Sequence, residues 1–233
     1  MNHLYKTLRD CPQCSSTLHA CNFVEDCLEG TRFWSDGKLD TYALPGWLAY
    51  ARCPLCQEPL KINGWPKSNA PKAAFRRAPS VEWPDAAGFR QLIERALAAN
   101  DREEEKLVRI AYWLHLNDAL RSGHLRLRPV IDDAWQLALD QNLARLAHLL
   151  DETVPDERLR KGEVLRERGF FDEALKMLRD LPPKLQWNAD QIAIHAASGN
   201  EALFGLENSS GVWMPIPPAS GNTRGIADVT RLG

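Results

Sequence analysis

The chain has 233 residues, of which 44% are hydrophobic and 26% charged, and its formal net charge is −2. This composition is typical of an ordinary globular protein, and the small net charge argues against a nucleic-acid binder that is basic over its whole surface. No apolar run reaches the ~18–20 residues of a membrane span, and the first residues lack the apolar segment of a secretory signal. We therefore expect a cytoplasmic protein without membrane contact.

The first motif in chain order is a Cys-Pro-x-Cys sequence that occurs twice, at residues 11–14 and 53–56. Two residues between two cysteines let one tight turn direct both sulfur atoms at one metal ion, and two such turns complete a tetrahedral shell. The sequence therefore predicts a structural zinc site in a zinc ribbon. The predicted ligands are Cys11, Cys14, Cys53 and Cys56.

Two other chemistries use similar motifs. Cys-Pro-x-Cys resembles the redox turn of glutaredoxin-like proteins, but there the second cysteine opens a helix that lowers the thiol pKa. Here Cys14 leads into Ser-Ser-Thr and Pro59 follows soon after Cys56, so neither cysteine opens an evident helix. Cys-Pro-Leu-Cys is also similar to the second knuckle of rubredoxins, which implies iron as the alternative metal, although Ser15 and Gln57 stand where rubredoxins usually have glycine.

Cys21, Cys27 and His19 lie near the first knuckle but form no further paired motif. Cysteines of this kind are usually buried or half-buried thiols, and a lone histidine beside a knuckle is usually not a ligand. We leave all three out of the metal site.

The 38 residues between the knuckles are more than compact two-knuckle sites have. They contain strand-forming residues on both sides of the turn signal Ser35-Asp36-Gly37, which predicts an extra hairpin. Residues 49–52 and 59–63 predict the two strands that flank the second knuckle.

Residues 61–80 carry five basic residues and no acidic one. Trp34, Trp47 and Trp65 lie around this stretch, and aromatic residues interleaved with basic ones could bind single-stranded nucleic acid. The net charge of residues 1–80 is only +3, which is small for a surface that follows phosphates. We expect a small ribbon with little core to use its tryptophans for packing and the linker to be solvated by its basic residues, so a nucleic-acid-binding ribbon is an alternative that we do not favour.

The remaining sequence predicts an α-helical body. Residues 107–114 and 135–150 each carry apolar residues at helical spacing, with Asp101 as a cap of the first helix and Asn142 as a polar interruption in the second. Thr153-Val-Pro-Asp156 predicts another helix start, with Thr153 as the capping residue.

The hairpin after that start resembles one tetratricopeptide (TPR) repeat. The residues that carry this resemblance are Gly162, Leu165, Gly169, Phe171, Ala174 and Leu178. In such a repeat the small residue lets two helices approach closely. Because one repeat cannot bury its own faces, residues 89–121, 130–150 and 185–198 are expected to stack on it.

These patterns predict a mostly α, α+β fold with four parts: a zinc ribbon (1–63), a basic Pro/Gly-rich linker (64–86), a TPR-like helical domain (87–199) and a Pro-rich tail (200–233). The chain resembles uncharacterised bacterial proteins that join such a ribbon to a repeat-like helical domain, on the strength of residues 33–37, 44–45, 53–56 and 162–178. That resemblance implies fold and metal but no activity.

The sequence carries no phosphate-binding loop, nucleophile elbow or HExxH motif. We therefore expect a non-enzymatic zinc-binding adaptor. An unknown protein partner would bind the helical domain or the tail, and a CxxC redox protein is a weaker alternative.

Overall fold

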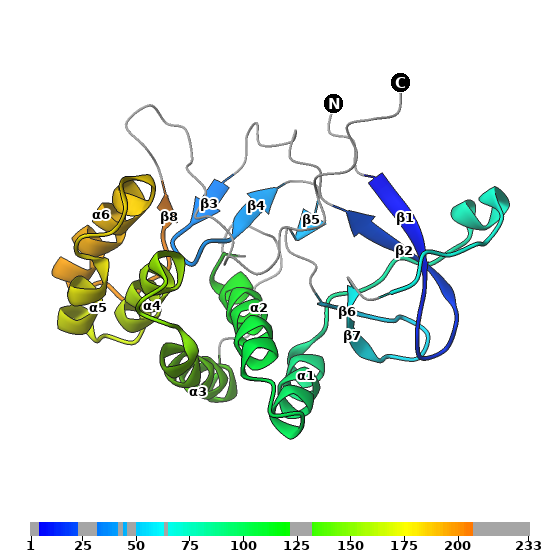
Figure 1. Cartoon of the computed structure of the whole chain (residues 1–233), viewed down its shortest axis with the longest axis horizontal. Coiled ribbons are helices and arrows are strands. Elements are labelled where there is room, and N and C mark those ends of the chain that lie inside the picture. Colours follow the sequence, from blue (N-terminus) through cyan, green and yellow to red (C-terminus); the bar gives the residue numbers. More distant parts are fainter. Residues whose placement is uncertain are drawn as a thin grey trace. The chain divides into compact units, whose positions relative to one another are not determined.

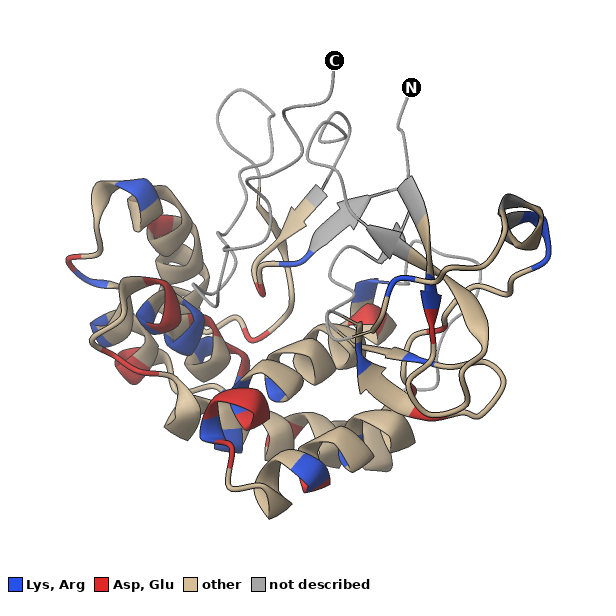
Figure 2. Cartoon of the chain, turned by 45° about the vertical axis from the view of Figure 1, so that its right-hand side comes forward, with Lys and Arg blue, Asp and Glu red and all other residues tan. Residues whose placement is uncertain are grey.

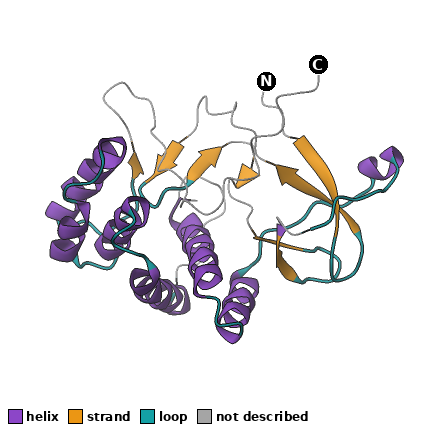
Figure 3. Cartoon of the chain, viewed as in Figure 1, coloured by secondary structure: helices purple, strands orange, loops and turns teal. Residues whose placement is uncertain are grey.

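The computed structural model describes residues 5–22, 32–41, 44–45, 50–62, 65–121 and 132–206. In this part of the chain, small antiparallel strand pairs precede six α-helices, as the sequence predicts for a mostly helical α+β fold (Figures 1 and 3). None of the described helices is long and apolar enough to cross a membrane.

The chain divides into two compact units. One unit contains Met1–Arg32 and Leu39–Leu149, and the other contains Phe33–Lys38 and Leu150–Gly233. The predicted ribbon, linker, helical domain and tail have other boundaries, and those boundaries stay a prediction.

Two hairpins in the first unit carry the knuckles. Strands β1 (Tyr5–Asp10) and β2 (Thr17–Asn22) pair antiparallel, with Asp10 opposite Thr17 at the end nearest the first knuckle. Strands β6 (Tyr50–Arg52) and β7 (Pro59–Lys61) pair in the same way around the second knuckle. The two strands predicted beside that knuckle are thus confirmed.

Residues 65–82, most of the stretch expected to be a linker, lie against these hairpins. Their backbone hydrogen bonds join Pro66 to Asp10, Ser68 to Leu8, Pro79 and Val81 to His19, and Glu82 to Arg52. The 3-10 helix Lys72–Arg76 lies between the two ends of this segment. The segment is therefore attached to both knuckle hairpins, and its middle part extends from β1 and β2 (Figure 1).

The extra strands expected between the knuckles are also present. Strand β3 (Arg32–Trp34) is followed by a turn in which Gly37 has φ +84°, and then by β4 (Leu39–Thr41). Strand β4 pairs with β5 (Leu44–Pro45). Trp47 lies outside the described residues.

Helices α1 (Ala86–Ala98), α2 (Arg102–Arg121) and α3 (Asp133–Leu149) pack in sequence in the first unit. Asp101 caps α2 as predicted, because its carboxylate accepts a hydrogen bond from the backbone N–H of Glu104 at 2.9 Å. Asn142 interrupts the apolar stripe of α3 because its amide donates to the backbone carbonyl of Arg109 on α2 at 2.9 Å.

Helices α4 (Pro155–Glu167), α5 (Phe171–Leu178) and α6 (Pro183–Ala197) pack together in the second unit. The predicted cap at Thr153 is wrong. The helix begins at Pro155 with Val154 as its N-cap, and the Thr153 hydroxyl donates to the Asp151 carboxylate at 2.7 Å instead.

The expected close approach of α4 and α5 is present at Gly162. A Cβ atom at this position would lie 2.7 Å from Cδ2 of Leu178, so only glycine fits without a shift. The helical hairpin formed by α4 and α5 is present. That this hairpin is one repeat of a stacked TPR array stays a prediction. Residues 200–206 also belong to this unit, because β8 (Gly205–Leu206) pairs with β3.

Candidate metal centre

Both knuckles have the same backbone conformation. In the first, the N–H of Cys11 donates to the carbonyl of Ser16 at 2.9 Å, and the N–H of Ser15 donates to the carbonyl of Cys11 at 2.8 Å. The second knuckle repeats both bonds from Cys53 to Glu58, at 3.1 and 2.9 Å. Ser15 and Gln57, the two residues that follow the second cysteine of each motif, have φ of +59° and +61°. The turns are therefore built alike although neither has glycine at this position.

The two knuckles bring the four predicted ligands together. Their Sγ atoms all lie within 4.8 Å of one another. Sγ of Cys11 is 3.8 Å from Sγ of Cys56, and Sγ of Cys14 is 3.7 Å from Sγ of Cys53. These distances are far above the ~2.05 Å of a disulfide. They agree with the ~3.8 Å sulfur separation of a tetrahedron with Zn–S bonds of about 2.3 Å.

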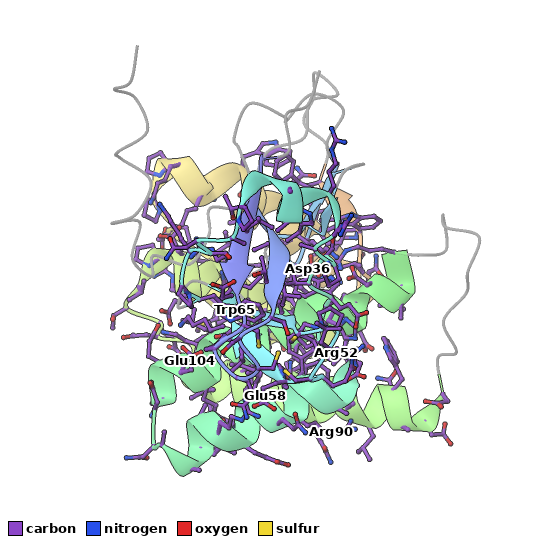
Figure 4. All side chains as sticks on the ribbon, turned by 90° about the vertical axis from the view of Figure 1, so that its right-hand side faces the viewer. Asp36, Arg52, Glu58, Trp65, Arg90 and Glu104 are labelled. Atoms are coloured by element: carbon purple, nitrogen blue, oxygen red, sulfur yellow. The ribbon has the colours of Figure 1, made fainter. Side chains whose placement is uncertain are left out.

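An apolar cluster covers one side of the four sulfur atoms. Cys11, Cys53, Leu18 and Trp65 are its buried members, and the partly buried Cys56, Leu60 and Val81 pack against it. Cys14, in contrast, is exposed. Arg52 and Glu58, labelled in Figure 4, flank the second knuckle in the sequence, since Arg52 ends β6 and directly precedes Cys53. The site is thus half enclosed, and low polarity on one side strengthens the attraction between thiolates and a cation.

Three of these cysteines have shifted pKa values. The hydroxyl and the backbone N–H of Ser16 lower the pKa of Cys14 to about 6, and the Cys14 sulfur lies 3.2 Å from that hydroxyl. Burial raises the pKa of Cys11, and it raises the pKa of Cys56 to about 12. Because a metal binds thiolates, filling the site must release protons from the buried cysteines, and occupancy must fall in acid.

Charged residues fasten the second knuckle to α1. Arg52, which precedes Cys53, contacts Glu82 at 2.9 Å and Asp85 at 2.6 Å. Glu58, which follows the knuckle, accepts a hydrogen bond from Arg95 on α1 at 2.5 Å. Further along, Tyr50 donates to Glu104 on α2 at 2.9 Å. The metal-site hairpin and the first two helices therefore form one hydrogen-bonded set within the first unit.

Of the other candidates near the first knuckle, the structure describes the side chain of His19 alone. His19 is buried on β2, where its backbone pairs with residues 79–81, and it is not part of the described group that could hold a metal. Cys27 and the side chain of Cys21 lie outside the described residues. Strands, not helices, follow both knuckles, which removes the structural basis of the glutaredoxin-like interpretation.

The sequence interpretation that a small ribbon uses its tryptophans for packing agrees with the structure. Only 2% of the surface of Trp65 is exposed, and it packs in the cluster beside the cysteines. Trp34 is also buried. Neither of these two rings is available as a stacking platform for bases.

Comparison with models of known protein families, with curated protein sequences and with solved structures gave no match for this chain.

Proposed function

We propose that this protein is a non-enzymatic zinc protein in which Cys11, Cys14, Cys53 and Cys56 bind one structural ion. The separations of the sulfur atoms carry the proposal, because they fit a tetrahedral zinc tetrathiolate. Four protein ligands leave no open coordination position for a substrate or a water molecule, which favours a structural site over a catalytic one. Metal binding would supply much of the folding free energy of the two knuckle hairpins.

The adaptor part of the proposal rests on the helices. Helices α4–α6 form a compact group, and Phe170 and Ile194 expose large apolar surfaces on it. Helical repeats use such surfaces to bind peptides and proteins. We infer that a protein partner binds this helical surface, with zinc keeping the ribbon folded.

Elemental analysis of untagged protein purified without added metal tests the zinc site. We expect one colourless zinc per chain in the wild type and a loss of metal in Cys53→Ser. Visible thiolate-to-iron absorption bands would replace zinc by iron and favour electron transfer. Full metal content in Cys53→Ser would contradict the ligand assignment.

A pull-down with purified wild type and the surface variant Phe170→Asp/Ile194→Asp tests the adaptor part. We expect the variant to keep its zinc and its helical circular dichroism signal but to lose the partner. A partner retained equally by both proteins would contradict binding at this surface.

A further inference from the structure

The middle of the segment that lies on the knuckle hairpins forms a projecting loop, residues 67–80, which we call the basic finger. Backbone bonds hold both of its ends: Ser68 to Leu8 at 3.0 Å, and Pro79 to His19 at 2.8 Å. Isolated β-bridges add Arg9 with Lys67 and His19 with Ser80. The base of the finger is thus fixed on β1 and β2, and only its tip extends from them (Figure 1).

The sequence of the basic finger contains positively charged residues and no negatively charged one. Four of its residues are Lys or Arg, and no Asp or Glu occurs between Glu58 and Glu82. Figure 2 shows the blue residues on this projection without any red one beside them. Lys67, Arg76 and Arg77 are exposed, and none of the three forms an ion pair with a carboxylate of the described residues.

The other cations of the same unit are mostly paired. Those with a described carboxylate partner are Arg52, Lys61, Arg95, Lys106, Arg109, Arg121 and Arg145. Arg52 and Lys61 belong to the hairpin around the second knuckle, so cations paired with carboxylates occur within the ribbon as well. Unpaired cations that are concentrated on one anchored projection form a local positive potential that attracts anions.

The chemistry of the basic finger favours phosphates over an acidic protein surface. Protein interfaces need buried apolar or aromatic anchors, whereas contacts to a nucleic-acid backbone use Lys, Arg and hydroxyl groups. The large apolar side chains that the described structure exposes all lie elsewhere, and Ser68, Asn69 and Ser80 supply polar groups in the finger. Trp65 and Trp34 are buried, so neither of these two rings offers bases an aromatic platform.

We propose that the basic finger binds the sugar–phosphate backbone of nucleic acid, without reading its sequence. Lys67, Arg76 and Arg77 contact phosphates, and the metal-site hairpins present them at a fixed position. This binding does not depend on base identity, and it goes beyond the proposed structural role of zinc. Each neutralised phosphate contributes about −0.9 to the slope of log K against log salt for a duplex. Contacts from Lys67, Arg76 and Arg77 therefore give a slope of about −2.7, and a contact from the fourth basic residue, Lys72, would make it about −3.6.

Fluorescence anisotropy with a labelled 20-base-pair DNA duplex, at salt concentrations from 20 to 200 mM, tests the proposal. The variant is Arg76→Glu/Arg77→Glu, and the matched control is Lys176→Glu/Arg179→Glu, which changes the net charge equally at two exposed cations without described carboxylate partners. We expect the finger variant to lose at least about tenfold in affinity at low salt and to flatten the slope by about 2, while the control stays within about threefold of the wild type. A second duplex of unrelated sequence should bind equally.

Three results would overturn the proposal. The first is that the wild type does not bind the duplex at 20 mM salt. The second is that the finger variant and the control variant lose the same amount of affinity for DNA. The third is that polyglutamate binds the protein as strongly as DNA does. The last result would assign the finger to acidic proteins. Zinc content, measured on the same samples, is expected to be unchanged in both variants. The zinc measurement tests the metal site and the anisotropy measurement tests nucleic-acid binding by the finger, so the two proposals can fail independently.

Discussion

At each knuckle, the residue after the second cysteine has a left-handed backbone conformation without being glycine. Ser15 and Gln57 both have φ near +60°. This conformation lets the chain turn back so that Ser15 N–H reaches the carbonyl of Cys11. It costs an L-residue with a Cβ atom roughly 1–2 kcal/mol. The metal site therefore tolerates some backbone strain, which a substitution can relieve or increase.

We expect Ser15→Gly to keep the metal and to leave the free energy of unfolding unchanged or raise it by up to about 1 kcal/mol, because glycine adopts positive φ freely. Ser15→Val should lower that free energy by about 1–2 kcal/mol, because a β-branched residue is a genuine outlier at positive φ. Urea unfolding of the zinc-loaded proteins measures both changes. Ser15 is exposed, so lost packing does not confuse the comparison. Equal stability of the two variants would show that the turn adopts another conformation.

A second residue-scale feature is the buried carboxylate of Glu105 on α2. Only 2% of this residue is exposed, and it accepts hydrogen bonds from Arg109 at 2.8 Å and from Arg145 on α3 at 2.9 and 2.8 Å. The hydrogen bonds from Arg145, and then those from Arg109, lower the pKa of Glu105 to about 2. The charged form therefore joins α2 to α3.

Because the pKa of Glu105 is lower in the folded state, its stabilising contribution is complete above about pH 4.5 and disappears as the pH falls toward 2. We expect Glu105→Gln to lower the free energy of unfolding by about 2–3 kcal/mol at pH 7, and this difference should shrink between pH 4.5 and 2. Denaturant unfolding of both proteins at several pH values measures it. The cysteine site is the same in both, so its own acid sensitivity cancels in the difference. A difference that is constant down to pH 2 would contradict the assigned pKa.

At the scale of elements, one carboxylate joins the second knuckle hairpin to the start of α1. Oδ1 of Asp85 accepts the backbone N–H of Gly88 at 2.8 Å as the N-cap, and Oδ2 contacts Arg52 at 2.6 Å. The N–H of Gly88, and also Arg52, hold the pKa of Asp85 below its usual value. A single side chain thus begins a helix and holds the strand that leads into Cys53.

Replacing Asp85 separates these two roles. We expect Asp85→Asn, which keeps a capping oxygen, to lower the free energy of unfolding by less than about 1 kcal/mol, because the contact with Arg52 is half exposed. Asp85→Ala removes the cap as well and should lower it by about 1–2 kcal/mol. Thermal unfolding of both variants gives the comparison. If Asp85→Asn were as destabilising as Asp85→Ala, the ion pair and not the cap would dominate.

The elements also show which features the sequence could predict. The cysteine spacing predicted the ligands because two residues between cysteines determine a local turn, and the apolar stripes predicted helices because their period is local as well. The cap at Thr153 was placed wrongly because Asp151 competes for its hydroxyl and the helix starts one residue later.

The pairing of residues 65–82 was missed for a different reason. The partner atoms lie up to about sixty residues away in the chain, in strands β1, β2 and β6. A Pro- and Ser-rich composition indicates irregular backbone and carries no information about which distant strand will accept its hydrogen bonds. Such contacts depend on the whole fold, and no pattern in one sequence reports them.

At the scale of the whole molecule, the two units have separate sources of stability. The apolar cluster beside the cysteines is small, so we expect the knuckle hairpins to depend on metal for their folding. The second unit buries its own side chains, among them Leu159, Leu185 and Ile192, and a fully buried ion pair between Glu163 and Arg166 at 2.7 Å. Losing the metal should therefore destabilise the knuckle hairpins more than it destabilises the second unit.

Hydrogen exchange followed by mass spectrometry can measure this inequality in the zinc-loaded wild type, in the wild type treated with a chelator, and in Cys53→Ser. We expect metal loss to remove protection from residues 5–22 and 50–62, and to reduce it at the start of α1, because Asp85 and Arg52 couple this helix end to the second knuckle. Helices α4–α6 should keep their protection, since their buried residues lie in the second unit, to which residues 33–38 between the two knuckle hairpins also belong. Equal loss of protection in α4–α6 would mean that the chain unfolds as one cooperative unit. Unchanged protection of the hairpins without metal would show that the apolar cluster and the strand pairing hold the ribbon by themselves, and the ion would then have a role other than structural.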